Sequence, residues 1–559
     1  MDPALMDAQR LPALLAGSRR SLLAQLVGIG FAQASVAVTG VLLVRHTFDL
    51  FLRGHHQTPE AELVPLGAGL VALALLDGWF RMLERVQAEK LGQEYVLAVR
   101  GTLFEHLLGV TPRTLRSQSR GGMLLRFAND FTPLRQWSSL GVARIAVVSV
   151  VVPVTVIALG WIDWRFSTWA CAVLALGFLC ALRQAKPMRE ATLEARRRRA
   201  RIATNVSEKL SALFVVQAHG QERRETKKLR RQGRRLFEAM VARARALGRV
   251  NAFVQASTSL AAAGVLLLGA HRVADGSMTP GTVVAAMTLI GIVVRPLHDM
   301  TRVFEYWQGA RISREKLGVF LALPLAGHAK ASRRLRRRGA CEVRFENVSV
   351  AGALEGVEAT AKRGGLTVIV GANGSGKSTL LALASGLLAP ERGRVLLDGR
   401  DLARIRPRDL RRHVGMAGPE LPLLRGTIRE NVLYRRPDAP EEELRKACAL
   451  CGVDALCASL PEGLDTRVEE GGQGLSPGHR TRIALARALL GTPDLLLLDE
   501  IDSSMDSESR AALDGVVSCY PGTVLLATHD PELVGRAEVV WRLEAGRLAP
   551  QSCAVLDNS

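Results

Sequence analysis

The chain has 559 residues, too many for a single hydrophobic core, so two or three domains are expected. Lys and Arg exceed Asp and Glu by 74 − 53 = 21, a balance that suits an anionic membrane surface or nucleic acid. The first three-fifths carry long apolar runs separated by Arg-rich stretches, and the last two-fifths alternate short β-like runs with helical patterns, which excludes a purely soluble protein.

Six apolar stretches are long enough to be predicted as membrane-spanning helices, because a span needs about 20 mostly apolar residues. They are Leu22–Val44, Leu63–Met82, Val142–Ile162, Phe166–Leu182, Phe253–Ala270 and Thr282–Leu297. The links within the pairs 1–2, 3–4 and 5–6 are short. The links between spans 2 and 3 and between spans 4 and 5 contain roughly 60 to 70 residues of charged, helix-favouring sequence. These long links are predicted to form helices that project into the cytoplasm.

Charged residues are sparse within the spans. Arg295, next to Pro296, is either a substrate contact or a structural residue. Asp77 and Arg81 lie near the inner end of the second span, where snorkelling or pairing between helices is expected.

The densest basic runs are Arg196–Arg199 with Arg201, then Arg223–Arg235, and Arg333–Arg338. They lie between or just after apolar spans, which places them on the cytoplasmic side of a lipid bilayer by the positive-inside rule. No nucleic acid is expected as a partner, because neither interleaved aromatic residues nor a nucleic-acid-binding module accompanies them. The excess of Arg over Lys is typical of a GC-rich bacterial genome, so the expected location is the bacterial inner membrane.

Eight cysteines are scattered along the chain and imply no disulfide framework. Cys448-x-x-Cys451 with Cys457 resembles half of a metal site, but it lies on a helical pattern and lacks a second matched pair. Reduced structural cysteines are therefore the prediction.

A phosphate-binding loop is the clearest motif of the last two-fifths of the chain. Residues 371–379 fit the pattern G-x-x-x-x-G-K-[ST], after the predicted strand Leu366–Val370 and at the start of a predicted helix. Backbone N–H groups of such a loop surround phosphates, and the helix N-terminus adds its positive dipole end. Lys377 is expected to hold the β- and γ-phosphates of ATP and Ser378 to bind Mg²⁺. The predicted nucleotide-binding residues here are Gly371, Asn373, Gly374, Ser375, Gly376, Lys377, Ser378 and Thr379.

Two later strands are predicted to deliver the groups for hydrolysis. The apolar run Leu495–Asp499 ends in a carboxylate suited to the nucleotide-bound Mg²⁺, and Glu500 follows, placed to orient or deprotonate the attacking water. Another apolar strand ends at His529, which could reach the γ-phosphate. The predicted catalytic residues are therefore Glu500 and His529, and the predicted metal ligands are Ser378 and Asp499.

On these motifs the chain resembles the ATP-binding cassette (ABC) family, specifically half-size exporters. Ser503–Asp506 resembles the D-loop of the family and Thr466–Gly472 the X-loop of exporters, while segments within 121–130 and 208–222 resemble the loops that carry coupling helices. The resemblance implies an α-helical membrane bundle of six transmembrane helices plus an α/β P-loop nucleotide-binding domain. The expected domains are a membrane domain 1–325, a basic linker 326–340 and a cytoplasmic nucleotide-binding domain 341–559. It also implies ATP-driven alternating access, with two cassettes closing around two ATP molecules.

The signature motif departs from the family pattern. Where the family has L-S-G-G-Q, this chain has Leu475-Ser476-Pro477-Gly478-His479. The resemblance implies that Ser476, Gly478 and the D-loop Asp506 contact ATP held by the other cassette. Pro477 has no N–H to donate, although proline is favoured in the first turn of a helix. Weakened contact is therefore expected, with the loop still folded.

Two further nucleotide-contacting positions also depart from the pattern. Pro419 stands where the family has the Q-loop glutamine, and Glu420 is a possible substitute. The segment Val350–Gly352 lacks the aromatic residue that stacks on adenine, a loss of about 1 kcal/mol, or roughly fivefold in affinity.

Intact phosphate-loop residues beside a damaged signature suggest two unequal ATP sites, so a heterodimer with a second half-transporter is favoured over a homodimer. The missing glutamine argues the other way, since it would impair the site expected to be good. An ATP-sensing membrane regulator or gate with little productive transport is the alternative from another class.

Overall fold

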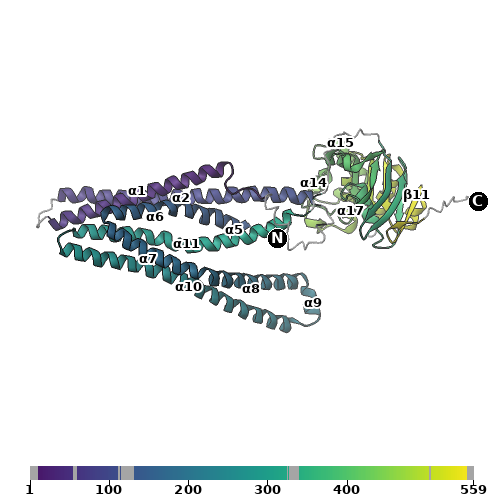
Figure 1. The fold of residues 1–559 in the computed structure, drawn as a ribbon. Coiled ribbons are helices and arrows are strands. Elements are labelled where there is room, and N and C mark those ends of the chain that lie inside the picture. The colour runs from purple at the N-terminus through teal and green to yellow at the C-terminus, as the bar shows by residue number, and fades with distance from the viewer. Residues whose placement is uncertain are drawn as a thin grey trace, which may run out of the picture. The chain divides into compact units, whose positions relative to one another are not determined.

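The computed structural model describes residues 11–53, 60–110, 114, 131–323, 325, 339–502 and 505–549, without the side chains of 52–53, 60–63, 295, 297–298 and 301. The chain divides into two compact units, one built from Met1–Leu107 and Arg120–Ala322, the other from Leu108–Ser119 and Leu323–Ser559. The first is helical and the second mixes helices with sheets (Figure 1). The expectations for residues 121–130, 326–338 and 503–504 lie outside the described residues.

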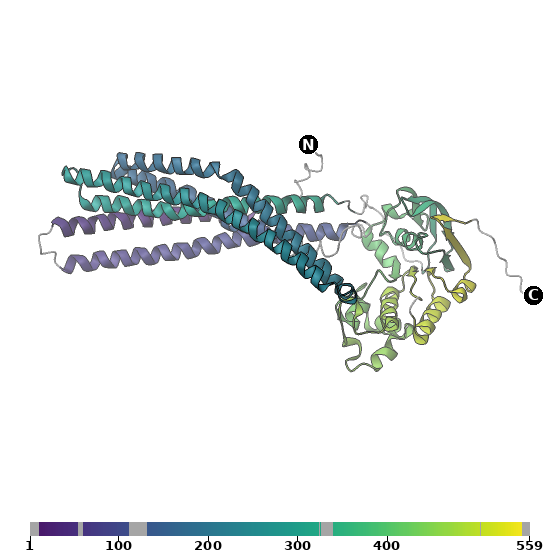
Figure 2. The same cartoon turned by 90° about the horizontal axis from the view of Figure 1, so that it is seen from below.

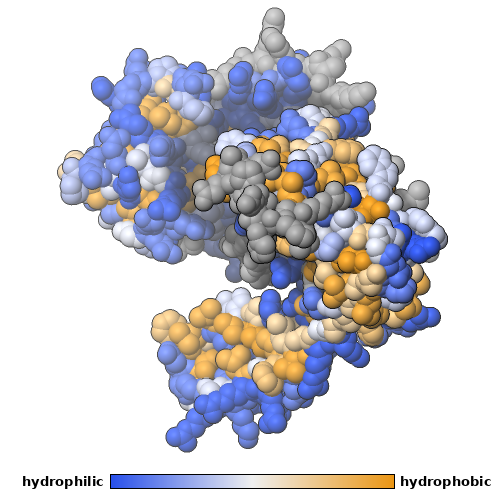
Figure 3. Space-filling view, turned by 90° about the vertical axis from the view of Figure 1, so that its left-hand side faces the viewer, coloured by the Kyte–Doolittle hydropathy of each residue, from blue (hydrophilic) through white to orange (hydrophobic). Residues whose placement is uncertain are grey.

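The first unit is built from helices alone among its described residues. They are α1 (Ser18–Arg53), α2 (Glu60–Gly109), α5 (Phe131–Gln136), η2 (Trp137–Val142), α6 (Ala143–Ile162), α7 (Trp164–Arg183), α8 (Ala185–Ser211), α9 (Leu213–Ala218), α10 (Glu222–Ala274) and α11 (Pro280–Leu321). Figure 2 shows most of them running roughly along one direction. Large apolar side chains such as Leu75 and Leu267, each 71% exposed, lie on their outer faces. Figure 3, an end-on view, shows such apolar areas between hydrophilic ones, as expected of helices whose sides contact lipid.

Five helical stretches in the described part of the chain are long and apolar enough to cross a membrane: Ser18–Phe51, Val64–Gly109, Phe131–Ile162, Trp164–Arg183 and Glu222–Ala274. They contain the first five predicted spans, apart from Leu63 at the start of the second. The sixth predicted span falls in α11, whose apolar part, Pro280–Val294, is shorter than the others. The helical membrane unit is thus confirmed, and the count of six spans stays a prediction.

The links at one end of the bundle are short, as the turn residues predict. A single residue, Asp163, separates α6 from α7. Its side chain is 3% exposed, accepts a hydrogen bond from the Arg165 N–H (2.9 Å) and forms an ion pair with Arg272 of α10. Thr279 caps α11, with Pro280 in its first turn, where a missing N–H costs nothing.

At the other end, the helices continue well beyond the apolar stretches. The helices α2 and α10 have 50 and 53 residues, so each is about 75–80 Å long, against roughly 30 Å of hydrocarbon. Two of the three basic runs, Arg196–Arg199 and Arg223–Arg235, lie on α8 and on the first half of α10, and α9 connects these two helices (Figure 1). The prediction of helical projections is confirmed for the link between spans 4 and 5. On α9, Phe214 is 86% exposed.

The described residues of the second unit form three sheets. A four-stranded antiparallel sheet has the order β2-β1-β4-β5, a six-stranded sheet the order β12-β11-β3-β10-β9-β6, and β7 pairs with β8. The strands are β1 (Val343–Val350), β2 (Leu354–Ala361), β3 (Leu366–Val370), β4 (Arg392–Leu397), β5 (Arg400–Asp401), β6 (Val414–Ala417), β7 (Gly426–Thr427), β8 (Arg467–Val468), β9 (Leu495–Asp499), β10 (Thr523–Ala527), β11 (Val539–Glu544) and β12 (Arg547–Leu548). In the large sheet, β11, β3, β10, β9 and β6 are mutually parallel.

Helices surround the large sheet on both faces. They are α12 (Lys377–Ala384), η3 (Leu402–Arg404), α13 (Pro407–His413), α14 (Ile428–Leu433), α15 (Glu441–Leu450), α16 (Val453–Ala458), η4 (Gly463–Asp465), η5 (Glu470–Gly472), α17 (Pro477–Leu489), α18 (Ser507–Cys519) and α19 (Pro531–Gly535). Every residue of β9 and β10 is buried, as expected of parallel strands covered on both sides. Two apolar clusters fill these layers, one on each side of the sheet.

The strand order determines what meets at the edge of this sheet. The predicted strands Leu366–Val370 and Leu495–Asp499 are confirmed as β3 and β9, and β10 lies between them. Because parallel strands present their carboxyl ends at one edge, the loops that follow β3, β10 and β9 lie side by side. These are the loops that carry Lys377, His529 and Glu500.

Candidate nucleotide-binding site

Glycines give the loop between β3 and α12 its shape. Gly374 and Gly376 have φ of +82° and +109°, conformations that L side chains rarely adopt. Gly376 is the residue directly before α12, so the first N–H groups of that helix point towards the loop. At Gly371 a Cβ atom would lie 2.3 Å from the carbonyl oxygen of Leu543. The shape of this loop therefore depends on its backbone, as is typical of loops that bind an anion through backbone N–H groups.

The Lys377 side chain, 3% exposed, lies at the centre of the site. Its Nζ donates to the Gly371 carbonyl at 2.8 Å and lies 3.1 Å from Glu500 Oε1 and 3.0 Å from His529 Nε2. A buried ammonium needs such partners to offset its lost hydration. The structure thus brings together three residues predicted from separate parts of the sequence, one from each loop at this edge of the sheet.

The two predicted metal ligands are also neighbours. The Ser378 hydroxyl donates to Asp499 Oδ1 at 3.1 Å, and Asp499 is 5% exposed. A hydroxyl and a carboxylate are oxygen donors of the kind that Mg²⁺ prefers, and Mg²⁺ takes few protein ligands and completes its shell with phosphate and water. Within the described residues, no group of three or more His, Cys, Asp or Glu side chains has the arrangement to hold a metal ion, so a Mg²⁺ ion here would depend on the nucleotide for further ligands.

Glu500 is held in an unusual backbone conformation. Its φ is +43°, a region that costs a non-glycine residue free energy, of order 1–3 kcal/mol. The Glu500 N–H donates to the Ala527 carbonyl at 2.9 Å, which fixes the turn after β9 against the end of β10. The turn directs the carboxylate towards Lys377. Strained residues of this kind concentrate at functional sites.

Asp502 and Thr528, which were not predicted from the sequence, connect the same two loops by a hydrogen bond. The Thr528 hydroxyl donates to an Asp502 carboxylate oxygen and also accepts from the Asp530 N–H at 2.9 Å. Both residues are within three positions of Glu500 or His529, so their place in the sequence was the available signal. They fix the separation between the loops that carry those side chains.

A cavity of about 320 Å³ adjoins the predicted metal ligands. Ser378 and Asp499 line one part of it, and Glu420 lines it as well. The neighbouring Pro419 is exposed. Val350 and Gly352, from the end of β1 and the following turn, form another wall, and no aromatic residue is among the described residues that line the cavity. Glu420 therefore shares a cavity with the predicted metal ligands Ser378 and Asp499, in the segment where the family has glutamine.

The signature segment keeps its helix cap despite its proline. Ser476 precedes α17, its hydroxyl accepts from the His479 N–H at 3.1 Å, and Pro477 occupies the first turn. Gly478 is buried, and a Cβ atom there would lie 2.5 Å from Asp506 Oδ2. The prediction that the loop still folds agrees with this geometry, because proline at the first helical position removes an N–H that no intrahelical bond uses.

Asp506 caps the next helix, α18, by accepting from the Ser509 N–H at 2.9 Å. Hydrogen bonds from Ser509 lower the pKa of this carboxyl, so it is ionised at neutral pH. The contacts described for Ser476, Gly478 and Asp506 are local and do not include Lys377. These three predicted residues thus form a group of their own, separate from the cluster around Lys377.

The cysteines of α15 and its C-terminal end are buried. Burial raises the pKa of Cys448 to about 12 and raises that of Cys451 further. Thiols with such pKa values stay protonated near neutral pH, and protonated thiols are poor metal ligands. The geometry favours the interpretation of these residues as reduced, structural cysteines.

Together, the fold and the site define a class: a membrane-spanning helical unit joined in one chain to a P-loop nucleotide-binding unit. The family model described as "ABC transporter" matches residues 354–503, and the model described as "ABC transporter transmembrane region" matches residues 25–297. The chain belongs to the ABC transporter family. It is therefore an integral membrane protein with an ATP-binding domain, and the α-helical plus α/β fold class predicted from the sequence is confirmed.

Several relatives cover both units. A multidrug efflux ATP-binding/permease protein of Mycobacterium tuberculosis is 28% identical over 552 residues, which are 96% of this chain and 45% of that protein. An ATP-dependent lipid A-core flippase of Chromobacterium violaceum is 26% identical over 87% of this chain and 84% of its own length. A solved structure of a bacterial Atm1-family ABC exporter with ATP bound has the same fold, with a TM-score of 0.83, 21% identity and 96% coverage of both chains.

An exotoxin translocation ATP-binding protein of Pasteurella aerogenes is 35% identical, but over 51% of this chain and 41% of its own length. The chain also spans about half the length of the mycobacterial relative. Family membership is thus shown across both units, while activity, cargo and partners are matters for the proposal that follows.

Proposed function

We propose that this chain is one half of an ATP-driven exporter, located in a bacterial inner membrane with its nucleotide-binding unit in the cytoplasm. The observation that carries the proposal is the grouping of Lys377, Glu500 and His529 beside the Ser378–Asp499 pair. The names of the relatives, which include efflux and translocation, support the outward direction. Its cargo is unidentified, its partners are a second half-transporter chain and the bilayer, and nucleic acid is not among them.

In this proposal the contacts around Lys377 exchange when ATP binds. The Lys377 ammonium leaves Glu500 and His529 for the β- and γ-phosphates, while the loop N–H groups surround the same oxygens. Glu500, then released, orients or deprotonates the attacking water, and His529 contacts the γ-phosphate. Ser378 and Asp499 would hold Mg²⁺, which supplies charge neutralisation at the phosphate oxygens when bound. Hydrolysis then drives the alternating access of the membrane unit.

The proline in the signature supports two unequal ATP sites and hence a heterodimer. The helix cap formed by Ser476 keeps the signature loop folded. Because Pro477 has no N–H, however, the loop offers one N–H group fewer to the phosphate held by the facing cassette. A partner with an intact signature would complete the site built on Lys377, and the partner's own ATP would face Pro477. A homodimer, in which both sites face Pro477, is the alternative, as is an ATP-sensing membrane regulator or gate.

The purified chain, reconstituted alone in lipid nanodiscs, should hydrolyse ATP slowly, because each site would be closed by a loop with Pro477. Replacement by glycine, Pro477→Gly, should raise the turnover roughly tenfold, since a hydrogen bond to a charged group contributes about 1.5–3 kcal/mol. Steady-state phosphate release measures both rates. Vigorous turnover by the unmodified chain alone would sink the heterodimer proposal.

Glu420 should take over part of the role of the missing glutamine. If its carboxylate contacts the nucleotide-bound metal, Glu420→Ala should raise the Mg²⁺ concentration needed for half-maximal hydrolysis about tenfold, which corresponds to about 1.4 kcal/mol. Titration of Mg²⁺ at saturating ATP measures this. The matched control is Glu442→Gln, since Glu442 is exposed on α15 and pairs with Lys446 at 2.6 Å. An unchanged Mg²⁺ dependence in Glu420→Ala would remove Glu420 from the site.

A further inference from the structure

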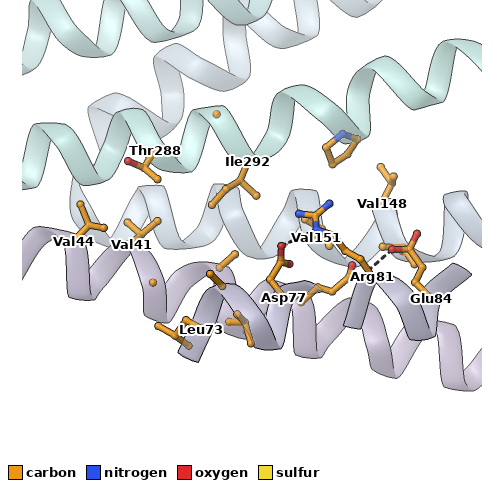
Figure 4. Close-up of a pocket in the computed structure, with 18 of the residues that line it drawn as sticks. Val41, Val44, Leu73, Asp77, Arg81, Glu84, Val148, Val151, Thr288 and Ile292 are labelled. Atoms are coloured by element: carbon orange, nitrogen blue, oxygen red, sulfur yellow. Dashed lines mark hydrogen bonds and ion pairs between the residues drawn. The ribbon is translucent and has the colours of Figure 1, made fainter. Parts of the chain in front are cut away.

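A second cavity, of about 590 Å³, lies within the membrane unit between α1, α2, α6 and α11 (Figure 4). Its volume falls within the roughly 300–1,000 Å³ range of pockets that bind small organic ligands. The cavity has two ends of different chemistry. Val41, Val44 and Leu73 line one end, and Asp77, Arg81 and Glu84 line the other (Figure 4).

The position of the charged end relative to the bilayer can be derived from α6, the helix that carries Arg144. Arg144 precedes Asp163 by 163 − 144 = 19 positions along α6, or roughly 28 Å at 1.5 Å per residue. That length is close to the hydrocarbon thickness of a bilayer, about 30 Å. The junction of α6 and α7, where Asp163 lies, is at the end of the bundle away from α9, which connects the basic helix α8 to the basic first half of α10 (Figure 1). The charged end therefore lies near the cytoplasmic leaflet surface, and the apolar end lies in the hydrocarbon.

One group of charges at this end is structural. Glu84 of α2 accepts hydrogen bonds from Arg144 of α6 and from Gln33 of α1, both at 2.8 Å. Arg144 is also paired with Asp299 of α11. The network joins all four helices that surround the cavity, and the Glu84 side chain is only 15% exposed. A ligand could not use these groups without separating the helices.

The second group of charges at this end, Asp77 and Arg81, does not join different helices. Asp77 and Arg81 are one turn apart on α2, with Arg81 Nε 2.7 Å from Asp77 Oδ2, and their side chains are 34% and 50% exposed. The sequence led us to expect snorkelling or a contact between helices, but the ion pair lies within a single helix. Such pairs are weak, and both charges line the cavity (Figure 4). A ligand that carries both signs of charge could therefore replace each partner with a better one.

We propose that this cavity binds a single-chain zwitterionic amphiphile from the cytoplasmic leaflet. The cationic group of the amphiphile contacts Asp77, its anionic group contacts Arg81, and its chain lies along Val41 and Leu73. Paired charges favour a zwitterion over a purely cationic or anionic head, which would leave one member of the pair unmatched at the edge of the hydrocarbon. As the cargo of the transporter, this ligand rests on the proposed function, but its binding needs neither ATP nor transport.

The test uses three probes with the same alkyl chain and different heads: dodecylphosphocholine, dodecyltrimethylammonium and dodecyl phosphate. Binding of each labelled probe to the full chain in nanodiscs is measured without ATP and below the micellar concentration. The zwitterion should bind about tenfold more tightly than either singly charged probe. Asp77→Asn should shift the preference towards dodecyl phosphate, and Arg81→Gln should shift it towards dodecyltrimethylammonium. These opposite shifts are not expected from a merely destabilised protein.

The control is another ion pair of the same spacing, Arg234 with Glu238 on α10, whose side chains are 85% and 64% exposed. Arg234→Gln and Glu238→Gln should leave the preference unchanged. Equal binding of the three probes by the unmodified chain, or shifts of the same sign in both cavity variants, would overturn the proposal. If head-group selectivity is found while Glu500→Gln leaves ATP hydrolysis intact, the hydrolytic mechanism fails and the cavity proposal stands. If hydrolysis behaves as proposed without head-group selectivity, the cavity proposal fails alone.

Discussion

Replacing Glu500 by glutamine should lower the ATP turnover rate by roughly 10²–10⁴-fold, the range that a positioned general base contributes. The amide keeps the shape of the side chain but cannot take a proton from water. Its contact with Lys377, whose Nζ is 3.1 Å from the native carboxylate, becomes a hydrogen bond from the ammonium to a neutral amide oxygen and is no longer an ion pair. ATP affinity should therefore stay the same or increase. Phosphate release and equilibrium binding of a fluorescent ATP analogue, measured on the same reconstituted samples, separate the two effects.

The same variant distinguishes a transporter from an ATP-sensing gate. A transporter should no longer complete its transport cycle when Glu500 is replaced, because the cycle needs hydrolysis. A gate should keep its conformational response to ATP, because that response needs only ATP binding. Glu442→Gln on exposed α15 again serves as the control and should keep the native rate. Unchanged hydrolysis in Glu500→Gln would assign the base to another residue.

Lys377→Ala should weaken ATP binding by roughly 150-fold, because the ammonium is expected to make two charge-assisted hydrogen bonds to phosphate, together worth about 3 kcal/mol. The loss should be seen without Mg²⁺ as well, since the lysine acts on the phosphates and not on the metal. Titration of the fluorescent analogue into the reconstituted chain measures it.

The matched control is Lys362→Ala. Lys362 is an exposed lysine just after β2, so this variant should bind ATP with native affinity. Thermal unfolding of both variants without nucleotide identifies any general loss of stability. A native ATP affinity in Lys377→Ala, with the fold intact, would contradict the role assigned to this loop.

Local patterns were sufficient to predict the elements that hold the nucleotide site. The runs Leu366–Val370 and Leu495–Asp499 are β3 and β9, because uninterrupted apolar residues of that length are typical of strands buried on both faces. The glycine pattern of residues 371–379 fixed the turn in the same way, since those backbone angles exclude most other residues. Here short-range chemistry and the final fold agree.

Features that depend on distant segments could not be predicted. The contact of Lys377 with His529 Nε2 joins residues 152 positions apart and follows from the strand order, which one sequence does not contain. The sequence also could not decide whether Asp77 pairs with Arg81 or with a residue on another helix. Helix periodicity allows the pair within α2 but does not exclude a partner elsewhere. The network that joins Glu84, Arg144 and Gln33 likewise required the packed bundle.

The ion pair between Asp163 and Arg272 constrains how the membrane unit can change shape. Asp163 is almost fully buried at the junction of α6 and α7, and Arg272 belongs to α10, so one interaction holds the ends of three helices together. Removing Arg272 would leave the buried Asp163 carboxylate without its charged partner, which is costly. At this end of the bundle the three helices should therefore move as one rigid piece.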